Sequence, residues 1–193
     1  MNPASEIKDP RVWPPSDLLL DDFAGDDLVS ALGTRWRGFS DRVMGGVSRE
    51  SVVPAEIDGR RCLRLTGDVR LDNDGGFIQM ALDLAADGAT FDASAYRGLS
   101  LEIRGNGEHY GLHLRTADCV RPWQSYRTGF VAEPHWHEIK LPFHAFAPHR
   151  LTAPLDISRL RRLGLVAIGR AFAADLAVAR LSLYRESEYD MYS

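Results

Sequence analysis

Two histidines separated by one residue give this 193-residue chain its most metal-like spacing. On an extended strand, His135 and His137 would point to the same face of a sheet. A transition-metal site needs a third and usually a fourth ligand. Glu138 follows at once but points to the opposite face, and His144 lies beyond a proline. We therefore expect two half-buried histidines here, with no metal and no cofactor.

Acidic residues offer two further kinds of chemistry. Paired carboxylates for glycoside hydrolysis would have to face one cleft, but Glu102 is the only acid central to a well-patterned strand. The chain also lacks a Gly-x-Ser-x-Gly elbow, a phosphate-binding loop and a dinucleotide fingerprint, so we expect a non-catalytic protein. One acidic loop could hold calcium, but its spacing gives no ligand set. A solvated loop is the simpler interpretation of Asp21, Asp22, Asp26 and Asp27.

An adjacent glycine pair, Gly45 and Gly46, is flanked by the strand formers Val43 and Val47, so we expect it to lie within a strand. Glycine weakens a strand unless the backbone bulges, takes positive φ or is approached closely. The pair therefore predicts a particular backbone shape, a bulged strand entrance. Nearby, Asp41 can bond neighbouring amides and Arg42 can bind a carboxylate. These two either fix a turn or belong to a ligand site, and physical chemistry alone favours the turn.

The middle of the chain alternates most clearly between apolar and polar residues, as half-buried strands do. Several arginines and a tryptophan stand at its outward positions. These arginines carry more positive charge than the one glutamate among them can neutralise. Such a surface suits a sugar, an anion or a peptide carboxylate, and a solvated sheet face with cross-strand pairs is the equal alternative. The residues of this expected surface are Glu102, Arg104, His113, Arg115, Trp123 and Arg127.

Strands must position all of these residues. Asp58-Gly59 predicts a hairpin turn, and Asp156 predicts a cap on a short helical turn over 157–162. In the last strand the apolar residues change from one face to the other, which predicts a β-bulge near Val178 or Ala179. About nine to eleven strands with closely spaced turns indicate a sandwich or barrel. We expect one domain over 17–186, between a loosely ordered arm at 1–16 and a tail at 187–193. The expected strands lie within 17–23, 43–47, 51–57, 61–69, 77–84, 99–104, 110–115, 123–131, 135–141, 163–168 and 176–183.

Composition and charge limit the class of protein. The formal net charge of −4 argues against a general nucleic-acid binder. No apolar run is long enough to span a membrane, and the N-terminus has the character of neither a secretory signal nor a mitochondrial presequence, so we expect a cytoplasmic location. Cys62 and Cys119 have no metal spacing and predict free thiols.

Several of these motifs together resemble a known family. The run Ser40 to Ser48, preceded by Trp36, is similar to the signature of the complex I intermediate-associated protein family, known for an assembly factor of mitochondrial NADH:ubiquinone oxidoreductase. Stretches within 73–77, 105–110 and 136–143 agree with it in order. The resemblance implies an all-β, antiparallel jelly-roll sandwich like those of galactose- and carbohydrate-binding modules, without established catalytic residues.

The resemblance also implies protein partners, namely complex I subunits or other assembly factors. A carbohydrate or small anionic ligand is the alternative suggested by the fold analogy. The family signature and the outward arginines together give the candidate binding residues. These are Trp36, Asp41, Arg42, Met44, Gly45, Gly46, Asn73, Arg104, His113, Arg115, Trp123 and Arg127.

Overall fold

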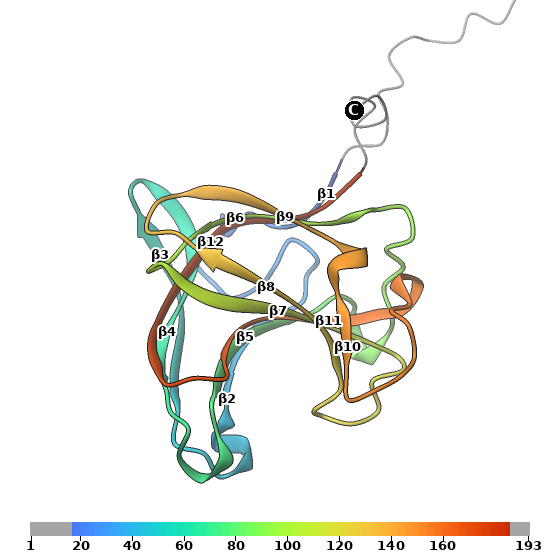
Figure 1. Ribbon diagram of the computed structural model, residues 1–193. Coiled ribbons are helices and arrows are strands. Elements are labelled where there is room, and N and C mark those ends of the chain that lie inside the picture. Colours follow the sequence, from blue (N-terminus) through green and yellow to red (C-terminus); the bar gives the residue numbers. More distant parts are fainter. Residues whose placement is uncertain (1–16, 186–193) are drawn as a thin grey trace, which may run out of the picture.

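The structure is a computed structural model that describes residues 17–185. Two antiparallel β-sheets pack face to face in this range, which confirms the expected all-β sandwich (Figure 1). The expected N-terminal arm, residues 1–16, and the C-terminal tail, residues 187–193, lie outside the described residues.

The first sheet has the strand order β3-β4-β12-β6-β9, and β1 pairs with β12 beside this path. Asp58 and Gly59 join β3 to β4 with φ values of 51° and 75°, so the predicted hairpin turn has the left-handed backbone that two-residue hairpins require. The strands are β1 (Leu18–Asp21), β3 (Arg49–Ile57), β4 (Arg60–Val69), β6 (Gly98–Arg104), β9 (His137–Pro142) and β12 (Phe172–Tyr184).

The second sheet has the order β10-β8-β7-β11-β5-β2. Its short edge strand β10 was not predicted, because three residues are too few to show an alternating pattern. The strands are β2 (Trp36–Ser40), β5 (Phe77–Asp83), β7 (Glu108–Thr116), β8 (Ser125–Ala132), β10 (Ala147–His149) and β11 (Leu160–Ile168).

Short 3₁₀ turns and one bulge complete the expected local features. The β12–β6 register shifts between Val178 and Arg180, which confirms the predicted bulge. Asp156 caps the expected helical turn by accepting a hydrogen bond from the Ser158 amide at 3.0 Å, although that turn ends at Arg159, where β11 follows. The turns are η1 (Asp41–Met44), η2 (Asp72–Asp74), η3 (Ala86–Gly88), η4 (Phe143–Ala145) and η5 (Ile157–Arg159).

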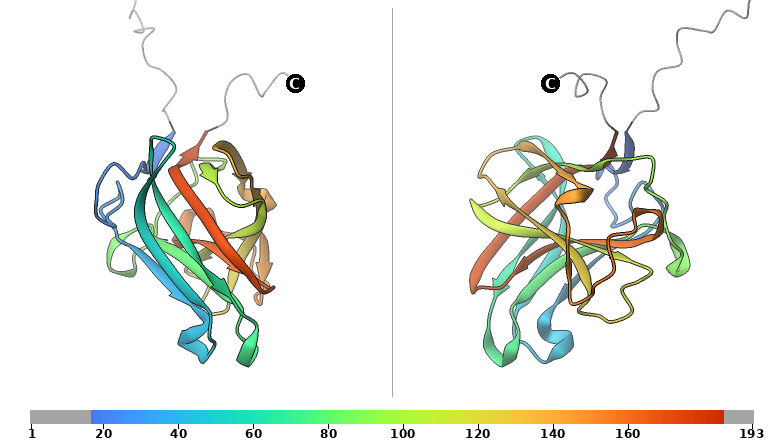
Figure 2. Two further views of the ribbon diagram at one scale, coloured as in Figure 1. Left: turned by 90° about the vertical axis from the view of Figure 1, so that its left-hand side faces the viewer. Right: turned by 45° about the vertical axis from the view of Figure 1, so that its right-hand side comes forward.

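The hydrophobic core fills the space between the two sheets, because alternate residues of every long strand point inward. In β7, for example, Leu112 and Leu114 are fully buried while His113 between them lies on the outer face. Trp36 is also in the core, and its indole nitrogen donates to Oδ2 of the buried Asp21 at 2.8 Å. The turns η1 and η2 lie side by side at the end of the sandwich opposite β1 (Figure 2).

Candidate functional site

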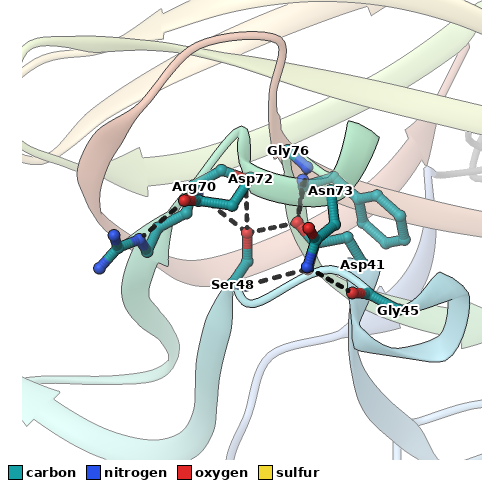
Figure 3. A network of polar contacts seen from close by, with 8 residues as sticks. Asp41, Gly45, Ser48, Arg70, Asp72, Asn73 and Gly76 are labelled. Carbon is teal, nitrogen blue, oxygen red and sulfur yellow. Dashed lines mark hydrogen bonds and ion pairs between the residues drawn. The ribbon is translucent and has the colours of Figure 1, made fainter.

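The family-like stretch is organised around the carboxylate of Asp41, which has no solvent exposure. Figure 3 shows this carboxylate between Ser48 and Gly76. Oδ1 accepts from the Ser48 amide at 2.9 Å, and Oδ2 accepts from the Gly76 amide at 2.5 Å and from the Ser48 hydroxyl. Asp41 therefore ties the segment after β2 to the segment before β5.

The same network extends along both segments. Arg70 donates its amide hydrogen to the Ser48 hydroxyl oxygen at 2.9 Å. The side-chain amide of Asn73 donates to the Gly45 carbonyl at 3.3 Å (Figure 3). Burial alone would raise the pKa of Asp41, but the hydrogen bonds from Ser48 and Gly76 outweigh burial and lower it. Asp41 is thus a charged structural anchor enclosed by its own chain.

The glycine pair serves this anchor in two different ways. Gly45 ends η1 with a φ of 87°, a conformation that residues with side chains rarely adopt. Gly46 has room for no side chain, because a Cβ there would lie 2.2 Å from Oδ1 of Asp41. Two of the expected reasons for glycine at these positions are therefore present, namely positive φ at Gly45 and close approach at Gly46. The predicted bulged strand entrance is wrong, however: the pair ends a 3₁₀ turn, since Asp41 holds the chain in a loop.

Apolar residues of the same stretch point outward instead. Val43 and Met44 are 72% and 63% exposed, and Val47 is exposed as well. Large exposed apolar side chains that gather in one place are typical of interaction surfaces. Arg42 lies beside them, exposed. The part of the signature that faces solvent is therefore mainly apolar.

The expected surface of six outward residues is divided by the fold. Arg104 lies on β6 of the first sheet and pairs with Asp58, and Glu102 on the same strand pairs with Arg60. His113, Arg115 and Arg127 lie on β7 and β8 of the second sheet. The prediction of one continuous polar surface was therefore wrong, because the outer faces of two packed sheets point in opposite directions.

Two other candidates have structural partners. Trp36 is buried and bonded to Asp21, so it is not available to a ligand. Arg115 donates to the backbone carbonyls of Cys119, Arg121 and Pro122 at 3.0 to 3.3 Å. Its guanidinium holds the loop before β8.

A pocket of about 500 Å³ lies on the outer face of the second sheet, at the end where η1 and η2 meet it. It brings together Met44 from the signature stretch and two outward residues, Trp123 and Arg127. Phe77 and Ile168, which pair directly across β5 and β11, supply more apolar lining. The remaining lining residues are Asp74, Gly75, Gly76, His149, Arg150 and Gly169.

The electrostatics of this pocket are mainly positive. Burial and the nearby Arg150 both lower the pKa of the Arg127 guanidinium. Burial, Arg127 and Arg150 likewise lower the pKa of His149. His113 lies next to Arg127 across the β7–β8 pair, and burial first and then Arg127 lower its pKa to about 3. Both histidines are therefore neutral at physiological pH, and the positive charge is that of the arginines.

Eight of the eleven lining residues were missed from the sequence, for reasons that differ. Asp74, Gly75, Gly76 and Gly169 are residue types that turns commonly contain, so they gave no sign of a binding role. His149 ends the short strand β10, which has no recognisable pattern, and Arg150 follows it. Phe77 and Ile168 look like ordinary apolar strand ends. Only the exposure of Ile168, at 37%, marks it as unusual in the folded chain.

The two histidines with metal-like spacing differ in exposure. His135 is exposed and only His137 is half-buried, so the expectation of two half-buried histidines was wrong for His135. The rings of His135 and His137 lie 5.3 Å apart, and only His137 belongs to β9. In the acidic loop, Asp21 bonds Trp36 and Asp26 pairs with Arg61. Across residues 17–185, no group of three His, Cys, Asp or Glu side chains could hold a metal ion.

Further features bear on the class of protein. Cys62 and Cys119 are both buried and unpaired, as expected of free thiols. A smaller cavity of about 210 Å³ adjoins Cys62, where Asp26 and Arg61 pair with each other. Within the described range, no helix combines the length and apolar character that crossing a membrane requires.

Comparison with solved structures places the fold among sugar-binding modules. A family 11 carbohydrate-binding module from Clostridium thermocellum, in complex with a β-1,3-1,4-mixed-linked tetrasaccharide, has a TM-score of 0.70 and 16% identity, covering 91% of this chain and 99% of that one. A family 30 module of a cellulosomal cellulase from Clostridium thermocellum has a TM-score of 0.61 and 18% identity, covering 89% and 99%. At these identities the likeness establishes the fold alone.

An agarase, AgWH50C, contains a similar fold as part of a larger protein. Its TM-score is 0.59 with 10% identity, and the match covers 90% of this chain but 25% of the agarase. No curated protein sequence matches the chain. The sequence profile described as complex I intermediate-associated protein 30 (CIA30), in contrast, matches residues 22–178. That range contains the Asp41 network and the whole lining of the pocket, and it spans most of the chain. The chain belongs to the complex I intermediate-associated protein 30 family.

Proposed function

We propose that this protein is a non-catalytic assembly factor for respiratory complex I that holds a partner protein against the pocket on the second sheet. Family membership supports the link to complex I. The observation that carries the location of the site is the arrangement of the signature stretch. Its buried Asp41 fixes the loop, and the same loop places the exposed Met44 in the pocket beside Trp123.

The partners would be complex I subunits or other assembly factors, met from the cytoplasmic side. An exposed apolar rim around a pocket is the usual composition of a protein-binding surface, where a few large side chains supply most of the affinity. Met44 and Trp123 are exposed at 63% and 56%, and both would be buried by a partner.

Carbohydrate binding is a second candidate, and one observation favours it. Trp123 presents an exposed ring at the border of a pocket on a sheet face. An amphipathic aromatic ring of this kind can stack on the apolar face of a sugar. A screen of the purified protein against β-glucan and agarose oligosaccharides would test this second function directly.

Deletion of the gene in the native host tests the assembly role. We expect less assembled complex I on native gels and lower NADH:ubiquinone oxidoreductase activity, both restored by the intact gene. A double variant, Met44→Ser with Trp123→Ala, should fold normally, because both side chains are already exposed, and should fail to restore assembly.

The matched control is Val53→Ser, which changes an exposed apolar residue on β3 of the first sheet and should restore assembly fully. Normal complex I in the deletion strain would contradict the assembly role. Full restoration by the double variant would show that assembly does not depend on the pocket.

A further inference from the structure

The pocket on the second sheet contains positive charge that the protein does not neutralise. Arg127 is half-buried, and Arg150 is close enough to lower its pKa. No ion pair among residues 17–185 involves either of them, whereas Arg64 pairs with Asp175 and Arg162 with Asp83 elsewhere on the sheets. An uncompensated, partly desolvated cluster of like charges favours an anionic ligand.

The geometry of Arg127 leaves donors free for such a ligand. Its Nε donates to the Ser125 hydroxyl oxygen at 2.8 Å, which fixes the plane of the guanidinium. No hydrogen bond within the described chain uses its two terminal nitrogens. A guanidinium fixed in this way can donate two parallel hydrogen bonds to one carboxylate.

Arg150 occupies an unusual backbone conformation beside it. Its φ of 61° is left-handed, a conformation that is unfavourable for a residue with a side chain. Gln124 stabilises this conformation by donating its side-chain amide to the Arg150 carbonyl at 3.1 Å. Backbone strain kept at the border of a charged pocket is typical of binding sites.

The rest of the pocket determines what kind of anion fits. Met44, Phe77, Trp123 and Ile168 make the lining largely apolar next to the arginines. A small inorganic anion would gain nothing from these side chains, and a neutral sugar would leave the guanidiniums without a counter-charge. Asp74, the only carboxylate in the lining, lies on η2 and would repel an acidic group from that part of the pocket.

We propose, on the basis of the assembly role above, that the pocket binds a short extended peptide segment of a partner protein in which an apolar side chain stands two residues from a carboxylate, so that both point to the same face. The carboxylate is held between Arg127 and Arg150, and the apolar side chain lies against Met44, Phe77 and Ile168. The volume of about 500 Å³ lies within the usual range of ligand pockets.

NMR titration of the full-length protein with a defined probe tests this proposal. The probe is an acetylated, amidated peptide of sequence Gly-Leu-Ser-Glu-Ser-Leu-Gly, in which Leu and Glu lie two residues apart and share a face. Its matched control has Gln in place of Glu. The reporters are the Trp123 indole N–H and the Arg127 Nε–H. We expect the acidic peptide to shift both signals and to bind about tenfold more tightly than the Gln peptide, because a charge-assisted contact is lost.

Variants sharpen the test. Arg127→Gln should weaken binding of the acidic peptide about tenfold, while Arg180→Gln, an exposed arginine on the first sheet, should leave it unchanged. Asp74→Asn should strengthen binding, because it removes a like charge from the pocket.

Equal binding of both peptides, or no binding of either, would overturn the proposal. So would shifts of equal size with phosphate alone, or shifts with a β-glucan tetrasaccharide and none with the peptides. None of these results would change the complex I defect expected in the deletion strain, so they would refute the peptide proposal and not the assembly role. Conversely, peptide binding together with normal complex I in that strain would refute the assembly role alone.

Discussion

Asp41 shows how one buried charge can organise a functional loop without contacting a ligand. Its two oxygens accept hydrogen bonds from the amides of Ser48 and Gly76. The Ser48 amide and hydroxyl lie seven residues ahead in the chain, and Gly76 lies 35 residues ahead. The sequence could predict that Asp41 bonds amides nearby, but a pattern in one stretch holds no information about a partner so distant.

Replacing this carboxylate should be costly. Asp41→Asn keeps the shape but turns an amide NH₂ group toward at least one donor, so buried hydrogen bonds are lost. We expect a loss of about 2 to 4 kcal/mol in the free energy of unfolding, measured by urea denaturation. The matched control is Asp74→Asn, at an exposed position of η2, which should change stability by less than about 0.5 kcal/mol.

The stability lost on replacing Asp41 by Asn should depend on pH. Because folding lowers the pKa of Asp41, its stabilisation is fully present above the pKa of the unfolded chain, about 4, and is lost as pH falls through the lower folded value. The stability difference between the wild type and Asp41→Asn should therefore shrink below about pH 4. A difference that stays constant down to pH 2 would contradict the charged state assigned to Asp41.

At the scale of elements, the loop before β8 is held by a side chain from the neighbouring strand. Arg115 extends from β7 and binds three carbonyls of residues 119–122, and Trp123 follows directly. From the sequence, Arg115 looked like an outward cation available to a ligand. Its true role was hidden because a loop that folds back over a strand leaves no periodic signal.

Arg115→Gln should therefore loosen this loop. We expect the free energy of unfolding to fall by about 1 to 3 kcal/mol and hydrogen exchange of the Cys119 and Gln124 amides to accelerate. Arg121→Gln, an exposed arginine in the same loop, should change neither quantity. Unchanged amide protection in the Arg115 variant would show that the three carbonyl contacts do not order the loop.

At the scale of the whole molecule, alternation predicted most strands because one face of each sheet is buried in a shared core. It could not show which sheet a strand joins. β6 and β7 follow each other across a tight turn, and Arg104 and His113 both face outward, yet the two strands belong to opposite sheets. Alternation distinguishes the inside from the outside of a sheet only. The pocket is built by five separated segments, so it became visible only in the folded chain.

Site-specific cross-linking in the native host can show whether a complex I partner binds this pocket. A photo-crosslinking amino acid replaces Met44 in the pocket or, as the control, Val53 on the outer face of the first sheet. Cross-linked products are identified by mass spectrometry. We predict that position 44 captures a complex I subunit or assembly intermediate and that position 53 does not. Capture of the same proteins at both positions, or of no complex I component at position 44, would contradict the prediction.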